Sequence, residues 1–209
     1  MKFPITKIFH SIQGEGHFVG YPMTFVRLAG CSVLNCSIRN ECDEAPWKTT
    51  RHMTAEEIVA EIQVMNRVGI VCITGGEPAD HDLVKLVSAL REPQTHRIHI
   101  ETSGTKSIEG IPFDWITVSP KVAEYKQRQG HTLKVVVRPE WGDPVRAWDH
   151  VAGISDCTDF FHRYLQPLSG SDGRPVNLPQ VIEMLTGGYR NSGARWALST
   201  QAHKNWGVL

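Results

Sequence analysis

The chain lacks the features that mark several large classes of protein. Its apolar runs, such as Ile70–Ile73, are far shorter than the ~20 residues that a membrane span needs. The segment Met1–Ile8 has no long apolar core of the signal-peptide kind. Basic and acidic residues balance at 22 each and form no basic stripe. We therefore expect no membrane partner and no direct nucleic-acid partner.

Cysteine is also scarce. Five cysteines are an odd number at low density, which argues against a secreted scaffold held by disulfides. The sequence therefore predicts a protein of a reducing cytoplasm. Cys72 lies in an apolar segment and is most simply a small buried hydrophobic side chain, and Cys157 stands alone.

The chain has no evident linker, internal repeat or low-complexity stretch, so residues 1–209 are interpreted as a single domain. Strands and helices alternate from Thr24 onward. The expected strands are Thr24–Leu28, Ile70–Thr74, Arg97–Glu101, Trp115–Val118, Thr132–Val137, Phe160–Gln166 and Arg195–Ser199. The expected helices are Thr54–Arg67, which opens on a capping box, Asp80–Arg91 with Asp80 as a plausible N-cap, and Pro179–Leu185.

Repeated strand–helix units predict an α/β fold with a mostly parallel sheet. The units are too few for a full eight-fold barrel, so a partial, incomplete βα barrel or a doubly wound sheet is expected. Polar or glycine-rich motifs follow most of the expected strands. Because sites in such folds form at the C-terminal ends of strands, these motifs should meet at one rim.

Three cysteines, Cys31, Cys36 and Cys42, follow the first of these strands. Three thiolates from one loop suit a metal centre with one open position, which is where chemistry takes place. Four residues and then five separate them, which is not the spacing of a zinc finger. A zinc site completed by His17 or His52, or simply free thiols, remains open at this point.

A second motif, Gly75-Gly76-Glu77-Pro78, follows the apolar segment Val71–Thr74. Glycines let the backbone approach a ligand closely, and a carboxylate beside them can accept hydrogen bonds from an ammonium group. The alternative is an ordinary turn between a strand and a helix.

Together the two motifs resemble the radical S-adenosylmethionine (SAM) superfamily. The resemblance implies that the three cysteines hold a [4Fe–4S] cluster whose fourth iron binds the amino and carboxylate groups of S-adenosylmethionine. It also implies that the Gly-Gly-Glu-Pro turn holds the methionyl ammonium. Such a cofactor pair supplies a 5′-deoxyadenosyl radical, while the protein supplies placement and exclusion of water.

The rest of the chain resembles one family within that superfamily, the 7-carboxy-7-deazaguanine synthases. Matching segments span residues 5 to 209 in the family's order. They are Ser11–Gly16, Phe25–Leu28, Gly30-Cys31, Glu101–Thr105, Val118–Lys121, Leu165–Leu168 and Leu198–Lys204. Each segment is weak alone, and the combination is specific. That family converts 6-carboxy-5,6,7,8-tetrahydropterin to 7-carboxy-7-deazaguanine with loss of ammonia, on the route to queuosine-type deazapurines.

The resemblance also implies roles for single residues. The residues expected to hold S-adenosylmethionine are Gly76, Glu77, Gly104, Ser119, Pro120, Lys121 and Gln166. Those expected to contact the pterin are Ile12, Gln13, Gly14, Glu15, Arg27, Thr102 and the terminal residue Leu209. Arg27 would pair with the substrate carboxylate through its planar fork, unless it is a surface cation on an edge strand. His203 and Lys204 are equally compatible with a solvated tail.

The chain departs from the family in two places. The cysteine spacing in the superfamily is usually three residues and then two, although this family tolerates insertions in the loop. After its third cysteine the family usually has Asp and then Thr or Ser, whose hydroxyl helps to bind Mg²⁺; this chain has Asp43 and Glu44. A carboxylate is a good ligand for a hard cation, so Glu44 could replace the hydroxyl, or the metal site is remodelled or lost.

The resemblance further implies a homodimer and an electron donor such as flavodoxin. A second enzyme class, an activase that places a glycyl radical on a partner protein, shares the cluster and the Gly-Gly-Glu-Pro turn. A non-enzymatic alternative is a zinc-stabilised interaction domain. Selective pterin binding distinguishes a 7-carboxy-7-deazaguanine synthase from a glycyl-radical activase. Iron content distinguishes both of these enzymes from the zinc-stabilised domain.

Overall fold

A computed structural model describes residues 1–42, 48–65, 69–92, 96–187 and 195–208. The strands within these residues form a single sheet in the order β3-β1-β2-β4-β5-β6-β7-β8-β9. Their bounds are β1 (Phe3–Ile12), β2 (Pro22–Leu28), β3 (Arg51–Met53), β4 (Gly69–Gly75), β5 (His96–Thr102), β6 (Trp115–Val118), β7 (Gln129–Val137), β8 (Asp159–Pro167) and β9 (Trp196–Leu198). β1 runs antiparallel to β2 and β3, and every pairing from β2 to β9 is parallel.

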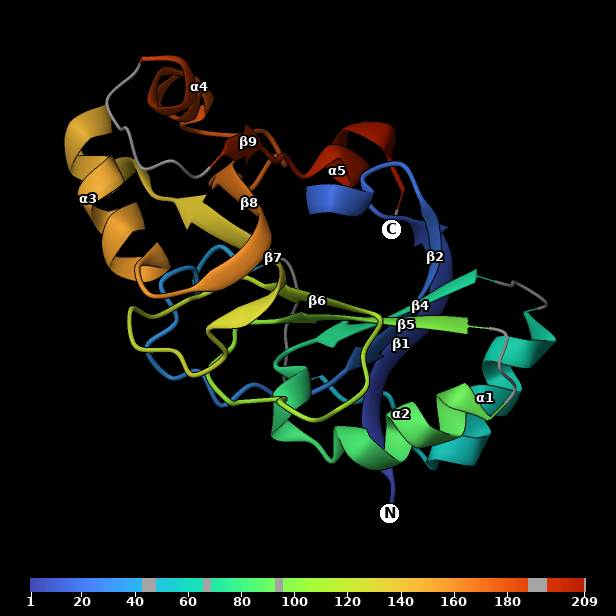
Figure 1. Cartoon of the computed structure of the whole chain (residues 1–209). Coiled ribbons are helices and arrows are strands. Elements are labelled where there is room, and N and C mark those ends of the chain that lie inside the picture. The colour runs from blue at the N-terminus through green and yellow to red at the C-terminus, as the bar shows by residue number, and fades with distance from the viewer. Residues whose placement is uncertain (43–47, 66–68, 93–95, 188–194, 209) are drawn as a thin grey trace.

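Most of the α-helices cover one face of the sheet (Figure 1). The α-helices are α1 (Ala55–Val64), α2 (Leu83–Arg91), α3 (Pro144–Ser155), α4 (Leu178–Thr186) and α5 (Ala202–Trp206). Short 3₁₀ helices are η1 (Gly16–Phe18), η2 (Pro78–Asp80) and η3 (Pro139–Trp141). One apolar core lies between α1, α2 and the strands β1 to β5, and a second lies between α3, α4 and the strands β6 to β8. None of the described helices is long and apolar enough to span a membrane.

Apolar and polar side chains alternate along the strands, so one face of the sheet is apolar and the other carries polar residues. In β7, Leu133 and Val135 belong to the core beneath α3 and α4, whereas Lys134 points to the opposite face and lines a cavity. In β5, Ile98 and Ile100 pack under the helices, and Glu101 lines the same cavity. Because successive side chains of a strand point to opposite faces, the inner face collects the polar residues.

The sheet is open, and the C-terminal segment crosses its opening. The Ala202 backbone amide donates to the Gly14 carbonyl at 3.0 Å, and the Gly16 amide donates to Ser199 Oγ at 3.0 Å. In Figure 1, α5 accordingly lies beside the loop after β1, although the two are at opposite ends of the chain. The expected α/β fold, an incomplete barrel with a mostly parallel sheet, is confirmed.

All seven expected strands lie within or overlap observed ones, and Trp115–Val118 matches β6 in both bounds. The capping box is confirmed as well: Thr54 Oγ1 accepts from the Glu57 amide at 3.2 Å, and Glu57 Oε2 accepts from the Thr54 amide at 2.7 Å. α1 is described to Val64, with Met65 as its C-cap, and residues 66 and 67 of the expected helix lie outside the described part.

The expected N-cap of the second helix is wrong. α2 begins at Leu83 after Asp82, and Asp80 ends the preceding 3₁₀ helix η2 instead. The Asp80 carboxylate is held by another loop: it accepts from the Ser32 amide at 2.7 Å and from Ser32 Oγ at 2.6 Å. A competing hydrogen-bond partner, distant in sequence, therefore decides where this carboxylate points.

Sequence patterns also did not identify β1, β3, α3 and α5. β1 alternates imperfectly, because a register shift between Ile5 and Lys7 interrupts its pairing with β2. For α3 a signal was present: Asp143 accepts from the amides of Val145 and Arg146, and Pro144 occupies the first helical turn. Asp followed by Pro is a recognised helix start.

Candidate active site

A cavity of about 750 Å³ opens at the C-terminal ends of the parallel strands. It is lined by most of the residues that the sequence singled out. These are Ile12, Gln13, Gly14, Glu15, Arg27, Cys31, Cys36, Cys42, Gly76, Glu77, Thr102, Ser119, Lys121 and Gln166. Gly104 and Pro120 are not among the lining residues, and Glu44 and Leu209 lie outside the described part of the chain. The expected meeting of motifs at one rim is confirmed, because each of the five motifs that follow a strand contributes residues to the cavity.

The glycine-rich turn is fastened to the strand that leads into the cysteine loop. The Gly76 amide donates to the Leu28 carbonyl at 3.0 Å, and the Glu77 amide donates to the Gly30 carbonyl at 2.9 Å. Gly75 has φ +130°, and a Cβ built on it would overlap the Leu28 backbone. Only glycine therefore permits this approach, so the turn does more than connect β4 to η2.

Glu77 is 1% exposed, and its carboxylate organises the neighbouring motif after β5. Oε1 accepts from Thr102 Oγ1 at 2.5 Å and from the Ala79 amide at 3.0 Å. Oε2 accepts from the Ser103 amide at 2.8 Å and also from Ser103 Oγ. Four hydrogen bonds from the chain match the acceptor capacity of a carboxylate. In this structure Glu77 thus fixes Thr102 and Ser103 at the cavity wall.

The three cysteines of the loop line the same cavity. Burial raises the pKa of the Cys31 thiol, and the nearby charges of Glu77, Asp80 and Cys36 raise it further. No three His, Cys, Asp or Glu side chains of the described residues gather closely enough to hold one metal ion. A four-iron cluster makes a different demand, because each thiolate binds a different iron and the sulfurs surround the cluster. Three thiols that line one cavity suit that demand.

The cysteine loop is also tied down at two points beyond its cysteines. Asp80 holds Ser32 through the two hydrogen bonds given above and forms an ion pair with Lys106 Nζ at 2.6 Å. The Ser37 amide donates to the Lys121 carbonyl at 3.0 Å. These contacts connect the loop to the segments after β4 and after β6, so three motifs are held in one arrangement.

The segment after β6 and the last residues of β8 add polar groups to the same cavity. Lys121 Nζ donates to Ser119 Oγ at 2.8 Å. The pKa of Lys121 is lowered, first by burial and then by the charge of Lys134. Gln166 is buried, and its Oε1 accepts from Ser199 Oγ at 2.8 Å. Gly104, with φ +73°, shapes the turn behind Thr102, since its amide donates to Thr102 Oγ1 at 3.0 Å.

Arg27 lines the cavity from β2, which lies between β1 and β4 in the sheet. The alternative of a surface cation on an edge strand is therefore wrong. Its guanidinium carbon lies 5.4 Å from the centre of the Phe9 ring, a cation–π distance. The cation is thus held against an apolar wall, where it attracts an anionic ligand more strongly than it would in open water.

The C-terminal residues are part of the site as well. His203 and Lys204 line the cavity, so the alternative of a solvated tail is wrong for them. A Cβ on Gly14 would overlap His203, which shows how closely α5 packs against the loop after β1. Gln201 Nε2 donates to Glu15 Oε1 at 2.7 Å.

The inner face also carries two residues to which sequence reasoning gave no role, Lys134 and Glu101. Lys134 is 5% exposed and forms ion pairs with Glu15 and Glu101, the latter at 3.2 Å. Burial raises the pKa of Glu15, but the Lys134 ammonium and the hydrogen bonds from Lys134 and Gln201 outweigh it, and the pKa falls to about 2. The pKa of Glu101 is raised, mainly by burial.

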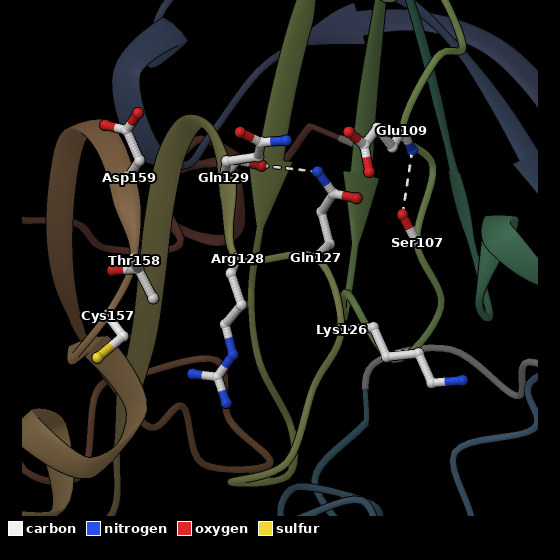
Figure 2. A pocket seen from close by; sticks show the side chains of 9 residues that line it. All are labelled: Ser107, Glu109, Lys126, Gln127, Arg128, Gln129, Cys157, Thr158 and Asp159. Carbon is white, nitrogen blue, oxygen red and sulfur yellow. Dashed lines mark hydrogen bonds between the residues drawn. The ribbon is translucent and has the colours of Figure 1, made fainter.

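A second cavity, of about 500 Å³, lies at the opposite ends of β7 and β8 (Figure 2). Arg128 and Lys126 give it two cations, but the Arg128 guanidinium donates to the carbonyls of Tyr125 and Ile154 and lies over the Tyr125 ring. Figure 2 shows Arg128 turned away from Asp159 and Gln129. Because this guanidinium is committed to backbone carbonyls, the cavity lacks the convergent polar groups of the first one.

Comparison with known proteins agrees with the chemistry of the first cavity. A family model described as the radical SAM superfamily matches residues 35–160. A protein of Synechocystis sp. named 7-carboxy-7-deazaguanine synthase is 34% identical over 220 residues, which cover 100% of this chain and 94% of the relative. The chain belongs to the 7-carboxy-7-deazaguanine synthase family. A family member from Bacteroides thetaiotaomicron is 33% identical over 201 residues, covering 96% of this chain and 95% of the relative.

A solved structure supports the same assignment at the level of the whole fold. The crystal structure of QueE from Escherichia coli aligns with a TM-score of 0.69 at 29% identity, covering 97% of this chain and 95% of that one. The chain is therefore a radical SAM enzyme of the 7-carboxy-7-deazaguanine synthase family, and this superfamily implies a [4Fe–4S] cluster and S-adenosylmethionine.

Proposed function

We propose that the chain converts 6-carboxy-5,6,7,8-tetrahydropterin to 7-carboxy-7-deazaguanine with loss of ammonia, as a step towards queuosine-type deazapurines. The observation that carries the proposal is the shared cavity. Its wall unites the three thiols, the Gly76-Glu77 turn and the Gln13–Glu15 segment, which come from widely separated parts of the chain. Each motif alone has a simpler explanation, such as free thiols or an ordinary turn. Those explanations do not account for the presence of all these motifs around one cavity. The proposed enzyme is a single domain over residues 1–209, which the continuous sheet of the described residues supports.

On the cofactor side, Cys31, Cys36 and Cys42 would hold the cluster. When bound, the cluster and S-adenosylmethionine would supply the radical chemistry that the removal of hydrogen from C6 of the pterin requires. Gly76 and Glu77 would hold the methionyl group, with Glu77 acting largely through Thr102 and Ser103, to which its carboxylate is bound. Further cofactor contacts would come from Ser119, Lys121 and Gln166, and the resemblance assigns Gly104 and Pro120 to the same cofactor.

On the substrate side, the chain's own residues would bind and orient the pterin and exclude water from it. Arg27 would pair with the substrate carboxylate through two parallel hydrogen bonds. Gln13 and Glu15 face the cavity on the side of α5, and Thr102 faces it beside Glu77. Ile12 and Gly14 would contact the pterin through their backbone.

Further parts of the proposal rest on the family resemblance. Glu44 would supply a carboxylate ligand to Mg²⁺ in place of the usual hydroxyl. The carboxylate of Leu209 would approach the pterin. The enzyme would act as a homodimer in the cytoplasm and receive electrons from a donor such as flavodoxin, without a direct nucleic-acid or membrane partner.

The decisive test is an anaerobic turnover assay. Protein reconstituted with iron and sulfide receives S-adenosylmethionine, a reductant and 6-carboxy-5,6,7,8-tetrahydropterin, and the deazapurine acid is detected by mass. We expect product together with 5′-deoxyadenosine. A brown, four-iron protein that makes neither compound would contradict the proposal.

The two alternatives predict other outcomes. A glycyl-radical activase shows no selective pterin binding, and the relatives' names do not favour it. A zinc-stabilised domain would contain zinc and be colourless. Neither His17 nor His52, the histidines considered as completing ligands, lines the cavity with the cysteines.

A further inference from the structure

Lys134 links the two halves of the cavity. Its Nζ donates to Glu15 Oε2 on the side of α5 and to Glu101 Oε2 at 3.2 Å on the side of the Thr102 motif. Glu15 is held in turn by Gln201 at 2.7 Å, and Thr102, the residue after Glu101, donates to Glu77. A connected line of polar groups therefore runs from the C-terminal segment to the glycine-rich turn, with Lys134 at its centre.

The two carboxylates that Lys134 holds are not equivalent. Glu15 accepts a close ion-pair contact from Lys134 on one oxygen and the Gln201 amide at 2.7 Å on the other. Glu101 accepts from Lys134 at 3.2 Å and from Gln13 Nε2 at 3.4 Å, and its side chain is 21% exposed against 15% for Glu15. Both hydrogen bonds of Glu101 are at or beyond the long end of the usual range, whereas those of Glu15 are short. Glu101 is therefore the more loosely held of the two carboxylates, and each of its oxygens can accept a further hydrogen bond from a ligand.

The chemistry of the substrate class supplies a matching donor. A pterin presents a ring N–H and an exocyclic amino group side by side on its amino-pyrimidine ring. A carboxylate accepts such a pair of donors with its two oxygens, and bonds of this kind to an ionised acceptor are strong. Glu101 faces the cavity one residue before Thr102 and opposite Gln13, between residues already assigned to substrate contact.

This placement works only while Glu101 is held and ionised. The titratable and charged groups that face it are Glu15 from the loop after β1, Lys134 from β7, Lys121 from the loop after β6 and Cys72 from β4. Burial and the charge of Glu15 favour the protonated form, and Lys134 opposes both. If Glu101 were protonated, its O–H would face the N–H donors of the ligand, and one hydrogen bond would be lost.

Resting on the proposed function, we propose that Glu101 accepts the N–H groups of the substrate's amino-pyrimidine ring. Lys134 is the positioning residue that fixes this carboxylate and keeps it an acceptor. The pair therefore determines specificity for a 2-amino over a 2-oxo ring, a property separate from the recognition of the substrate carboxylate by Arg27.

The test is equilibrium binding without turnover. Reconstituted enzyme with S-adenosylmethionine and no reductant is titrated calorimetrically, under anaerobic conditions, with 6-carboxy-5,6,7,8-tetrahydropterin and with its 2-oxo (lumazine) counterpart. Wild type should prefer the 2-amino compound. Glu101→Gln, which keeps the Lys134–Glu15 pair, should lose about 10- to 100-fold in affinity for it and lose most of the preference.

Lys134→Met should weaken binding of the 2-amino compound most at low pH, and affinity should recover as the pH rises and Glu101 ionises. The double variant Lys134→Met/Glu15→Gln removes both partners of one ion pair and should show the same pH profile. It replaces the single variant in the test if that variant folds poorly. Lys126→Met, an exposed lysine at the second cavity, is the matched control and should behave as wild type.

The outcomes separate the two proposals. Wild-type enzyme that binds neither compound overturns the proposed function. Wild type that binds the pterin, with an unchanged preference in Glu101→Gln or an unchanged pH profile in the Lys134 variants, overturns this inference alone.

Discussion

The backbone amide of Glu77 donates to the carbonyl of Gly30 at 2.9 Å, directly before Cys31. This single bond joins the glycine-rich turn to the start of the cysteine loop. Both motifs follow neighbouring parallel strands, β2 and β4, whose C-terminal ends lie side by side. The proposed cluster and the proposed methionyl contacts therefore share one rigid framework, and a disturbance of the framework should affect both.

Replacing Cys36 by Ala should abolish the four-iron chromophore, because a thiolate is lost from the cavity wall. Absorbance and iron content after anaerobic reconstitution measure this. Cys157→Ala is the control: Cys157 is exposed and lies at the second cavity, so the variant should reconstitute like wild type. A four-iron spectrum retained in Cys36→Ala would show that the ligand assignment is wrong.

Replacing Gly75 by Ala should lower the free energy of unfolding by about 2 kcal/mol or more. The new Cβ would overlap the Leu28 backbone, and φ +130° is unfavourable for alanine. Urea denaturation measures the change. Gly153→Ala is the matched control, since a Cβ there meets no atom of the described residues within 4 Å; in the helix α3 it should gain about 0.5–1 kcal/mol. Equal effects of the two substitutions would contradict the close-approach argument.

Sequence patterns predicted the parallel core well, because apolar segments such as Ile70–Thr74 and Trp115–Val118 are bounded by turn residues. The meeting of motifs at one rim followed from the same pattern, since the C-terminal ends of parallel strands share an edge. The sequence pattern did not predict β1, because its register shift between Ile5 and Lys7 breaks the alternation that identifies a strand.

The roles of Lys134 and Glu101 could not be derived in the same way. A lysine between Leu133 and Val135 in a buried strand was itself a signal, since a buried ammonium needs a partner. Its partners lie 119 and 33 residues away in the chain, so no local pattern reveals them. Only the folded sheet brings the three charges together.

Replacing Asp80 by Ala should speed the loss of iron to a chelator several-fold, because Ser32 loses both hydrogen bonds that hold the cysteine loop. The rate is followed anaerobically by the decay of the cluster absorbance. Asp82→Ala is a close control: Asp82 is the N-cap of α2, and its side chain makes no capping hydrogen bond. If both variants released iron at the wild-type rate, the contact between Asp80 and Ser32 would not secure the loop.

Replacing Glu15 by Gln should destabilise the protein in a pH-dependent way. The pKa of Glu15 is lowered from 4.5 to about 2: burial raises it, and the Lys134 ammonium and the bonds from Lys134 and Gln201 lower it more. A carboxyl with a lowered pKa stabilises the fold above its ordinary pKa, and this contribution is lost as the pH falls towards the folded value. By linkage the loss in Glu15→Gln is on the order of 3 kcal/mol at pH 7.

The difference in unfolding free energy between wild type and Glu15→Gln should therefore be constant from pH 7 to about 5 and shrink below about 4.5. Urea denaturation at several pH values measures it. Glu124→Gln, at an exposed position between β6 and β7, should stay within about 0.5 kcal/mol of wild type throughout. A difference that did not change with pH would mean that Glu15 stabilises the protein by its shape and packing, and that its ion pair with Lys134 contributes nothing.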